Sequence, residues 1–169
     1  MTPPPAAASR PGFWSFSTAV YSRPGVKEAC LALQEAGLDV NVALWIVWTV
    51  ITGRDPGPAL GQGLELSALW RSSVVEKLRE ARDALKPAPG FIDADAGSAL
   101  RHRILAAELE GERLQQAALS ALSPACPAHE RTDFEALSRE RLDTCAQACG
   151  AQAPTARFVE TVFSAVENV

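Results

Sequence analysis

The distribution of proline limits this chain to helices of short and medium length that are separated by loops. Its twelve prolines stand at positions 3, 4, 5, 11, 24, 56, 58, 87, 89, 124, 127 and 154. Proline breaks the interior of a helix but is accepted in first turns and loops. Between the prolines, apolar side chains recur at spacings of three and four, and no segment alternates as a strand does. The 30 alanines and 18 leucines also favour helix over sheet, because valine and isoleucine together contribute only 16 residues.

We therefore predict an all-α fold, a compact bundle of five to seven helices around a central apolar helix rich in tryptophan. The expected helices cover residues 13–21, 24–35, 39–52, 64–85, 98–122, 132–149 and 155–167. Residues 1–11, rich in proline and alanine, are expected to be a disordered leader. Residues 12–169 are expected to form a single domain, with 125–169 as a mobile C-terminal hairpin. Gly111, on the apolar stripe of its helix, predicts a close helix crossing.

The central helix, Val40 to Ile51, is apolar on every face, so it should be surrounded by protein. It is too short to span a bilayer, which takes about 20 residues. Two interpretations stay open: a core helix, or one wall of an apolar ligand pocket. In the second, the pocket is lined by Trp14, Trp45, Trp48 and Trp70, and Asn41 is the expected partner of an indole N–H. The predicted buried core is Leu44, Trp48, Leu69, Val74, Leu78 and Ile104.

The charge distribution disfavours several classes of partner. The net charge is −4, and the negative charge is concentrated after residue 90. Neither half has the clustered basic surface that nucleic acid or an anionic membrane requires. The start of the chain has neither a basic segment nor an apolar run, so we expect no export signal, a cytoplasmic location and reduced cysteines.

The N-terminal third also carries several short motifs in order. They are Phe13-Trp-Ser-Phe16, Tyr21-Ser-Arg-Pro-Gly-Val26, Ala29-Cys-Leu-Ala-Leu-Gln34 and Asp39-Val-Asn41, followed by the tryptophan-rich helix. Over residues 13–53 the sequence resembles a proteobacterial family of small proteins known only as a domain of unknown function. The resemblance implies a bacterial, stand-alone helical protein and brings no activity, substrate or cofactor with it.

Some polar residues permit both a functional and a structural interpretation. Tyr21 and Arg23 could form an anion-binding corner beside a helix N-terminus, or simply a turn between helices. Asp39 with Asn41 could anchor a ligand, or be an N-cap and a buried amide. Carboxylates gather at two places, and the arginines and lysines between them indicate solvated, ion-paired faces. These groups are Glu76, Glu80 and Asp83 with Lys77, Arg79 and Arg82, and Glu108, Glu110 and Glu112 with Arg113.

A metal site at the cysteines is a weak alternative interpretation. Cys126, His129, Cys145 and Cys149 are the right ligand types for zinc, but their spacing matches no standard finger. Cys145 and Cys149 also continue an apolar stripe, which is typical of buried free cysteine. We therefore expect no metal and no cofactor. A capping box is predicted at Thr132 to Glu135, at the start of the same helix.

No nucleophile motif, phosphate loop or dinucleotide fingerprint occurs in the chain. We therefore lean against an enzyme and predict a non-enzymatic assembly, adaptor or regulatory factor that binds another protein. Its binding surface is expected mainly after residue 91. The alternative is a small-molecule binder or enzyme that holds an apolar ligand against the four tryptophans. The sequence leaves the partner, the ligand and the oligomeric state open.

Overall fold

The computed structural model describes residues 11–166, so most of the predicted leader lies outside the described residues. A π-helical turn, η2 (Arg71–Val75), joins α4 to α5, and these two run as one continuous helix. The described chain has no strand, and its one β-bridge, Arg54 with Ala128, is isolated. The predicted all-α fold is confirmed. The helices are α1 (Phe13–Tyr21), α2 (Val26–Glu35), α3 (Val40–Ile51), α4 (Leu60–Trp70), α5 (Glu76–Asp83), α6 (Ala94–Ser120), α7 (Phe134–Ala148) and α8 (Thr155–Val166).

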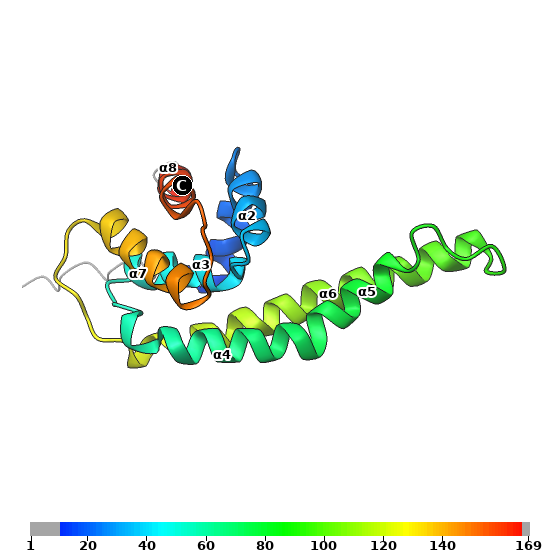
Figure 1. Cartoon of the computed structure of the whole chain (residues 1–169), viewed down its shortest axis with the longest axis horizontal. Helices are drawn as coiled ribbons and strands as arrows, with labels where there is room; N and C mark the ends of the chain where they lie inside the picture. Colours follow the sequence, from blue (N-terminus) through cyan, green and yellow to red (C-terminus); the bar gives the residue numbers. More distant parts are fainter. Residues whose placement is uncertain (1–10, 167–169) are drawn as a thin grey trace, which may run out of the picture. The chain divides into compact units, whose positions relative to one another are not determined.

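These helices form two compact units (Figure 1). The bundle unit comprises the residues up to Pro56 and those from Pro127 on, and holds α1, α2, α3, α7 and α8. The hairpin unit, Gly57–Cys126, holds α4, η2, α5 and α6. The residues expected to form one domain thus comprise a bundle with a helical hairpin inserted between α3 and α7. None of the helices within residues 11–166 has the length and apolar character that crossing a membrane requires.

Helix α3 is the centre of the bundle unit, as predicted. Eight of its twelve residues are buried, and Trp45 has no exposed surface. The helix packs against α7 and also contacts α1 and α2. Asp39 begins it as an N-cap, because its carboxylate accepts hydrogen bonds from the backbone N–H of Asn41 (2.8 Å) and Val42 (3.2 Å).

The C-terminal helices complete this core. Helix α8 packs against α2 and α7, and Phe158 on α8 and Leu142 on α7 are fully buried. The Arg141 guanidinium of α7 donates to both carboxylate oxygens of Asp55, at 2.7 and 2.8 Å, and so fastens α7 to the loop after α3. The mobility predicted for residues 125–169 stays a prediction, but their two helices supply part of the bundle's core.

In the hairpin unit, α4, η2 and α5 run antiparallel to α6, and glycines allow a close approach. The Trp70 indole N–H donates to the carbonyl oxygen of Gly111 at 2.8 Å, and a Cβ on Gly111 would lie 3.6 Å from Val75 Cγ2. That distance is an ordinary contact that an alanine would also make, so the close crossing predicted from Gly111 stays a prediction. Gly97 makes an even closer approach that the sequence did not predict: a Cβ there would lie 2.9 Å from the Cβ of Ala88.

The predicted core is only partly correct in the bundle unit and is wrong in the hairpin unit, where none of the four predicted residues is buried. Leu44 is buried and Trp48 is half-buried, but Leu69 is 70% exposed. At its level the inward row is Gly63, Ser67 and Trp70, so a glycine, a serine and an indole lie inside the hairpin instead of Leu69. The remaining predicted core residues are only half-buried, because a hairpin of two helices has no third layer to cover them. These are Val74, Leu78 and Ile104.

Several helix starts also differ from those predicted, because other residues act as caps. Helix α6 begins at Ala94, since the Asp93 carboxylate accepts from the N–H of Ala96 at 2.9 Å. Helix α7 is capped by Asp133 and not by the predicted Thr132. Helix α2 begins after Gly25, whose φ of 81° favours glycine, so the preceding proline stands outside its first turn.

Candidate functional site

The tryptophans of the predicted pocket differ in environment. Trp45 is buried inside the bundle, whereas Trp14 is 40% exposed. Trp48 stacks on Phe13, with 5.4 Å between ring centroids, and its indole N–H donates to the carbonyl oxygen of Pro11 at 3.1 Å. Trp70 belongs to the hairpin unit. The indole partners of Trp48 and Trp70 are thus main-chain carbonyls and not the predicted Asn41.

A surface depression of about 560 Å³ lies in the bundle unit at the connection between α7 and α8. Its lining consists of Asp143, Ala146, Gln147 and residues 151–154, and none of the eight predicted ligand-binding residues is among them. The hydroxyl of Thr155 donates to the Asp143 carboxylate at the edge of this depression. The tryptophan-lined ligand site therefore stays a prediction.

The corner between α1 and α2 is a tight turn. The backbone N–H of Arg23 donates to the carbonyl of Val20 at 3.0 Å, and the N–H of Val26 donates to the carbonyl of Arg23 at 3.3 Å. Arg23 is half-buried, and Tyr21 is 41% exposed. Turn geometry accounts for the backbone here, and anion binding at this corner stays a prediction.

The cysteines are all free thiols. Burial, assisted by the neighbouring Cys149, raises the pKa of the Cys145 thiol to about 12, and burial alone raises the pKa of Cys30 to about 12. His129 places Nε2 3.0 Å from the carbonyl oxygen of Val50 and packs edge-to-face on Phe134. In the part of the chain that the structure describes, no three His, Cys, Asp or Glu side chains are placed to share a metal ion.

The two predicted solvated faces are joined through a buried carboxylate, which the sequence analysis missed. Glu108 on α6 is only 3% exposed and accepts from Arg79 Nε at 3.0 Å and from an Arg82 guanidinium nitrogen at 2.6 Å. The prediction of a solvated face is therefore wrong for Glu108. The signal was present in the spacing, because Glu108 is four residues after Ile104 and three before Gly111, on the row that faces α5.

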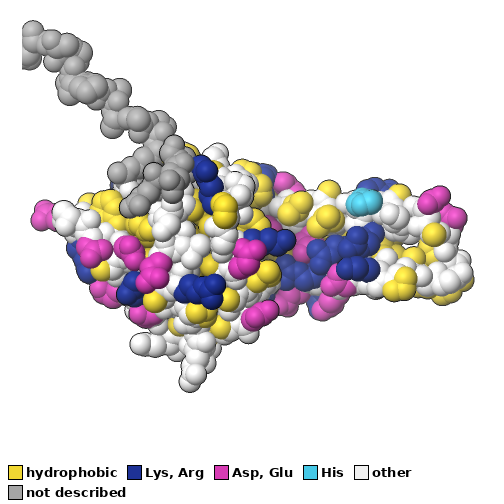
Figure 2. Space-filling model, turned by 90° about the horizontal axis from the view of Figure 1, so that it is seen from above, with side chains coloured by type: hydrophobic (Ala, Val, Ile, Leu, Met, Phe, Trp, Pro, Cys, Tyr) yellow, Lys and Arg dark blue, Asp and Glu magenta, His cyan; other side chains and the backbone are white. Residues whose placement is uncertain are grey.

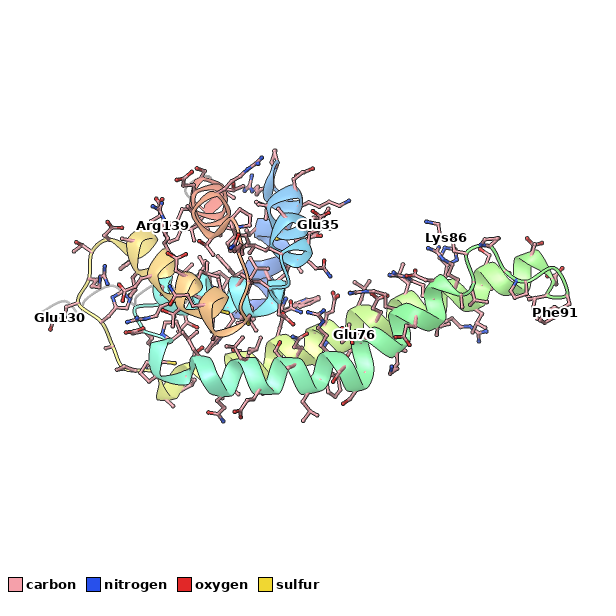
Figure 3. All side chains as sticks on the ribbon, viewed as in Figure 1. Glu35, Glu76, Lys86, Phe91, Glu130 and Arg139 are labelled. Carbon is pink, nitrogen blue, oxygen red and sulfur yellow. The ribbon has the colours of Figure 1, made fainter. Side chains whose placement is uncertain are left out.

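An apolar tip at the turn of the hairpin was also missed. Phe91 is 87% exposed and Ile92 is 40% exposed, in the loop between α5 and α6 (Figure 3). The backbone N–H of Ile92 donates to the carbonyl of Pro89 at 2.8 Å, and Pro87 also stands in this loop, so the turn is held in shape. No helical period covers these residues, so none of the apolar stripes in the sequence includes them.

The comparisons with known proteins bear on the family alone. Comparison with curated proteins and with solved structures gave no match. A family model described as a protein of unknown function (DUF2390) matches residues 12–119, which run from α1 almost to the end of α6. The match includes the motifs of the N-terminal third and extends over the hairpin. The chain therefore belongs to the DUF2390 family of proteins of unknown function.

Proposed function

We propose that this chain is a non-enzymatic protein that binds another protein through the tip of its hairpin unit. The observation that carries the proposal is the exposure of Phe91 beside Ile92 at the end of the helical hairpin. Aromatic side chains are enriched among the residues that contribute most to protein interfaces. A turn already held by two prolines loses little conformational freedom on binding, which favours affinity.

The distribution of exposed apolar side chains agrees with this location. Nine large apolar side chains of the described chain are exposed, and six of them belong to the hairpin unit. Five of the six stand at or after residue 91, where the sequence analysis expected the binding surface. The six are Leu69, Phe91, Ile92, Leu100, Leu109 and Leu114. The expected cytoplasmic location belongs to the same proposal, and the four free thiols are compatible with it.

Affinity capture from the native bacterium tests the proposal. The bait is the full chain, and the variant is Phe91→Ser with Ile92→Ser. The matched control is Leu31→Ser, because Leu31 is 45% exposed on α2 of the bundle unit. We expect a protein that the wild type and the control retain and the tip variant loses. The captured protein, once purified, should bind the wild type and the control directly and should not bind the tip variant.

Two results would contradict the proposal. In the first, every captured protein binds the tip variant as well as the wild type. In the second, light scattering shows that the purified wild type is a dimer and that the tip variant is a monomer. The tip would then be a surface for self-association. Circular dichroism of each variant confirms that the helices are intact.

A further inference from the structure

Along the part of the hairpin unit that leads to the apolar tip lie four positively charged side chains, Arg79, Arg82, Lys86 and Arg101. Figure 2 shows Lys and Arg side chains gathered in one patch on the hairpin. Arg79 and Arg82 are bound to the buried carboxylate of Glu108. Lys86 and Arg101 make no ion pair with any residue in the range 11–166.

The register of the hairpin places Arg101 alongside Lys86. Arg82 pairs with Glu108 at one level, and Ala88 meets Gly97 at another. Lys86 stands between Arg82 and Ala88, on the segment that follows α5. Arg101 stands between Gly97 and Glu108 on α6. Two cations without an ion-pair partner therefore stand at the same level of the hairpin, where a negative charge would be attracted to both.

Arg101 also lacks hydrogen-bond acceptors. Its Nε is buried and has no hydrogen-bond partner, and the residue as a whole is half-buried. A buried donor without an acceptor costs free energy, and a guanidinium binds a carboxylate in a strong, charge-assisted pair. Because Nε is closed to solvent, the terminal nitrogens of the same guanidinium are the donors that an oxyanion approaching from solvent would meet.

We propose that Lys86 and Arg101 bind a carboxylate of the partner protein, in a segment whose neighbouring apolar side chain packs on Phe91 and Ile92. This inference rests on the proposed function, since it describes the partner of the same tip. The tip and the cations are neighbours, because Ile92 Cγ2 would lie 3.6 Å from a Cβ on Gly97, one helical turn before Arg101. The partner segment is thus acidic and apolar together.

A protein carboxylate fits this site better than a nucleic acid does. Residues 57–126 contain eight Lys or Arg and nine Asp or Glu, so the hairpin has no excess of positive charge to attract a polyphosphate. Asp93 and Asp95, directly after the tip, would repel a run of phosphates. Two unpaired cations are enough for one or two carboxylates, which set partner choice and association rate.

Selection from a random peptide library on the immobilised full chain tests the inference. We expect the wild-type pool to be enriched in peptides that combine Asp or Glu with a large apolar residue. The variant Lys86→Gln with Arg101→Gln should lose the acidic enrichment, and Arg113→Gln should keep it. Arg113 is the matched control because it lies on α6 and is already paired with Glu110 at 2.6 Å. A synthetic peptide from the pool should bind the double variant on the order of tenfold more weakly, and added salt should weaken its binding to the wild type.

The outcomes separate this inference from the proposed function. Peptides that need Phe91 but show no acidic bias would overturn the acidic partner and leave the protein-binding tip in place. Peptides that bind without Phe91 and Ile92 would overturn both the acidic partner and the protein-binding tip. The absence of any enriched peptide would do the same. A single-stranded oligonucleotide that binds the wild type and is lost in the double variant would replace the protein carboxylate with a nucleic acid.

Discussion

The bundle unit and the hairpin unit are both helical, but their interiors differ. The bundle buries an apolar helix, α3, under α1, α2 and α7, and its largest fully buried side chain is Trp45. The hairpin has Glu108 and Gln115 in its interior, and Gln115 donates a hydrogen bond to the hydroxyl of Ser67. Burial of apolar surface is non-directional, whereas buried polar groups require particular partners. The bundle is therefore stabilised mainly by the apolar surface that it buries. The hairpin depends more on specific polar pairs, which fix the register between its helices.

The number of helices in each unit also explains how many large apolar side chains it leaves exposed. A bundle of five helices can enclose its apolar side chains, and only three of the nine exposed large ones are on it. The hairpin encloses some of its apolar side chains, such as Val75, but leaves leucines and Phe91 outside. An exposed apolar group on a small unit with a fixed register provides a surface of defined shape for a partner.

The largest effect should follow removal of residues 127–169. Deletion removes α7 and α8, which exposes α2 and α3 and the apolar side chains that Leu142 and Phe158 cover. We expect the bundle unit to lose its fixed packing, which near-ultraviolet circular dichroism of the tryptophans would show. A truncated chain that keeps the near-ultraviolet spectrum and cooperative unfolding would mean that α7 and α8 are not core.

Thiol reactivity should also report how closed the bundle is. Cys149 is exposed, whereas Cys30 and Cys145 are buried and have pKa values near 12, so these two stay protonated at neutral pH. Since the thiolate is the nucleophile, we expect iodoacetamide to modify Cys149 on the order of a hundredfold faster than the other two. Mass spectrometry of timed samples measures this, and equal rates would indicate that the bundle opens readily.

Truncation of the buried Trp45 and of the exposed Leu69 tests how differently the two units cover their apolar side chains. Trp45→Ala, in the bundle, should cost about 3–5 kcal/mol of unfolding free energy, as truncation of a buried large aromatic does. Leu69→Ala, in the hairpin, should change it by less than about 0.5 kcal/mol, because Leu69 is 70% exposed. Denaturant unfolding followed by circular dichroism measures both. Similar losses for the two variants would contradict the comparison.

Trp45 and Leu69 also show how far burial could be predicted from the sequence. Periodicity predicts a helix and its apolar stripe, and α3 followed this rule because its burial depends on apolar area alone. Leu69 lies on a good stripe, but η2 interrupts the helical period just after it, and Gly63, Ser67 and Trp70 face α6 instead. Specific pairs such as Glu108 with Arg79 and Arg82 depend on the register between two helices, which one helix's spacing does not contain. The apolar tip was missed because its residues belong to a loop.

The buried ion pairs of the hairpin should contribute less than Trp45 does in the bundle. Glu108→Ala leaves Arg79 and Arg82 without their shared carboxylate, and we expect a loss of about 2 kcal/mol. The loss is moderate because both arginines are partly exposed and regain water. Glu110→Ala is the control, since Glu110 is on the surface and its exposed pair with Arg113 should make no measurable difference to stability. Equal results for the two variants would show that Glu108 is not truly buried.

The smallest effect should come from Gly97→Ala, and its sign is informative. Alanine favours a helix over glycine by up to about 1 kcal/mol, but a Cβ at Gly97 would lie 2.9 Å from the Cβ of Ala88. Overpacking costs about 1–3 kcal/mol, so we expect a net loss of about 1 kcal/mol. Thermal unfolding measured by circular dichroism should show a lower melting temperature.

Gly61→Ala, in α4 of the same hairpin, provides the matched control. A Cβ there would meet nothing within 4 Å, so only helix propensity changes and the variant should be slightly stabilised. The double variant Gly97→Ala with Ala88→Gly removes the clash and should recover most of the loss. If Gly97→Ala stabilises the chain as Gly61→Ala does, then α6 and the tip loop do not approach as closely as the structure places them. The level at which Arg101 meets Lys86 would then no longer be fixed by that contact.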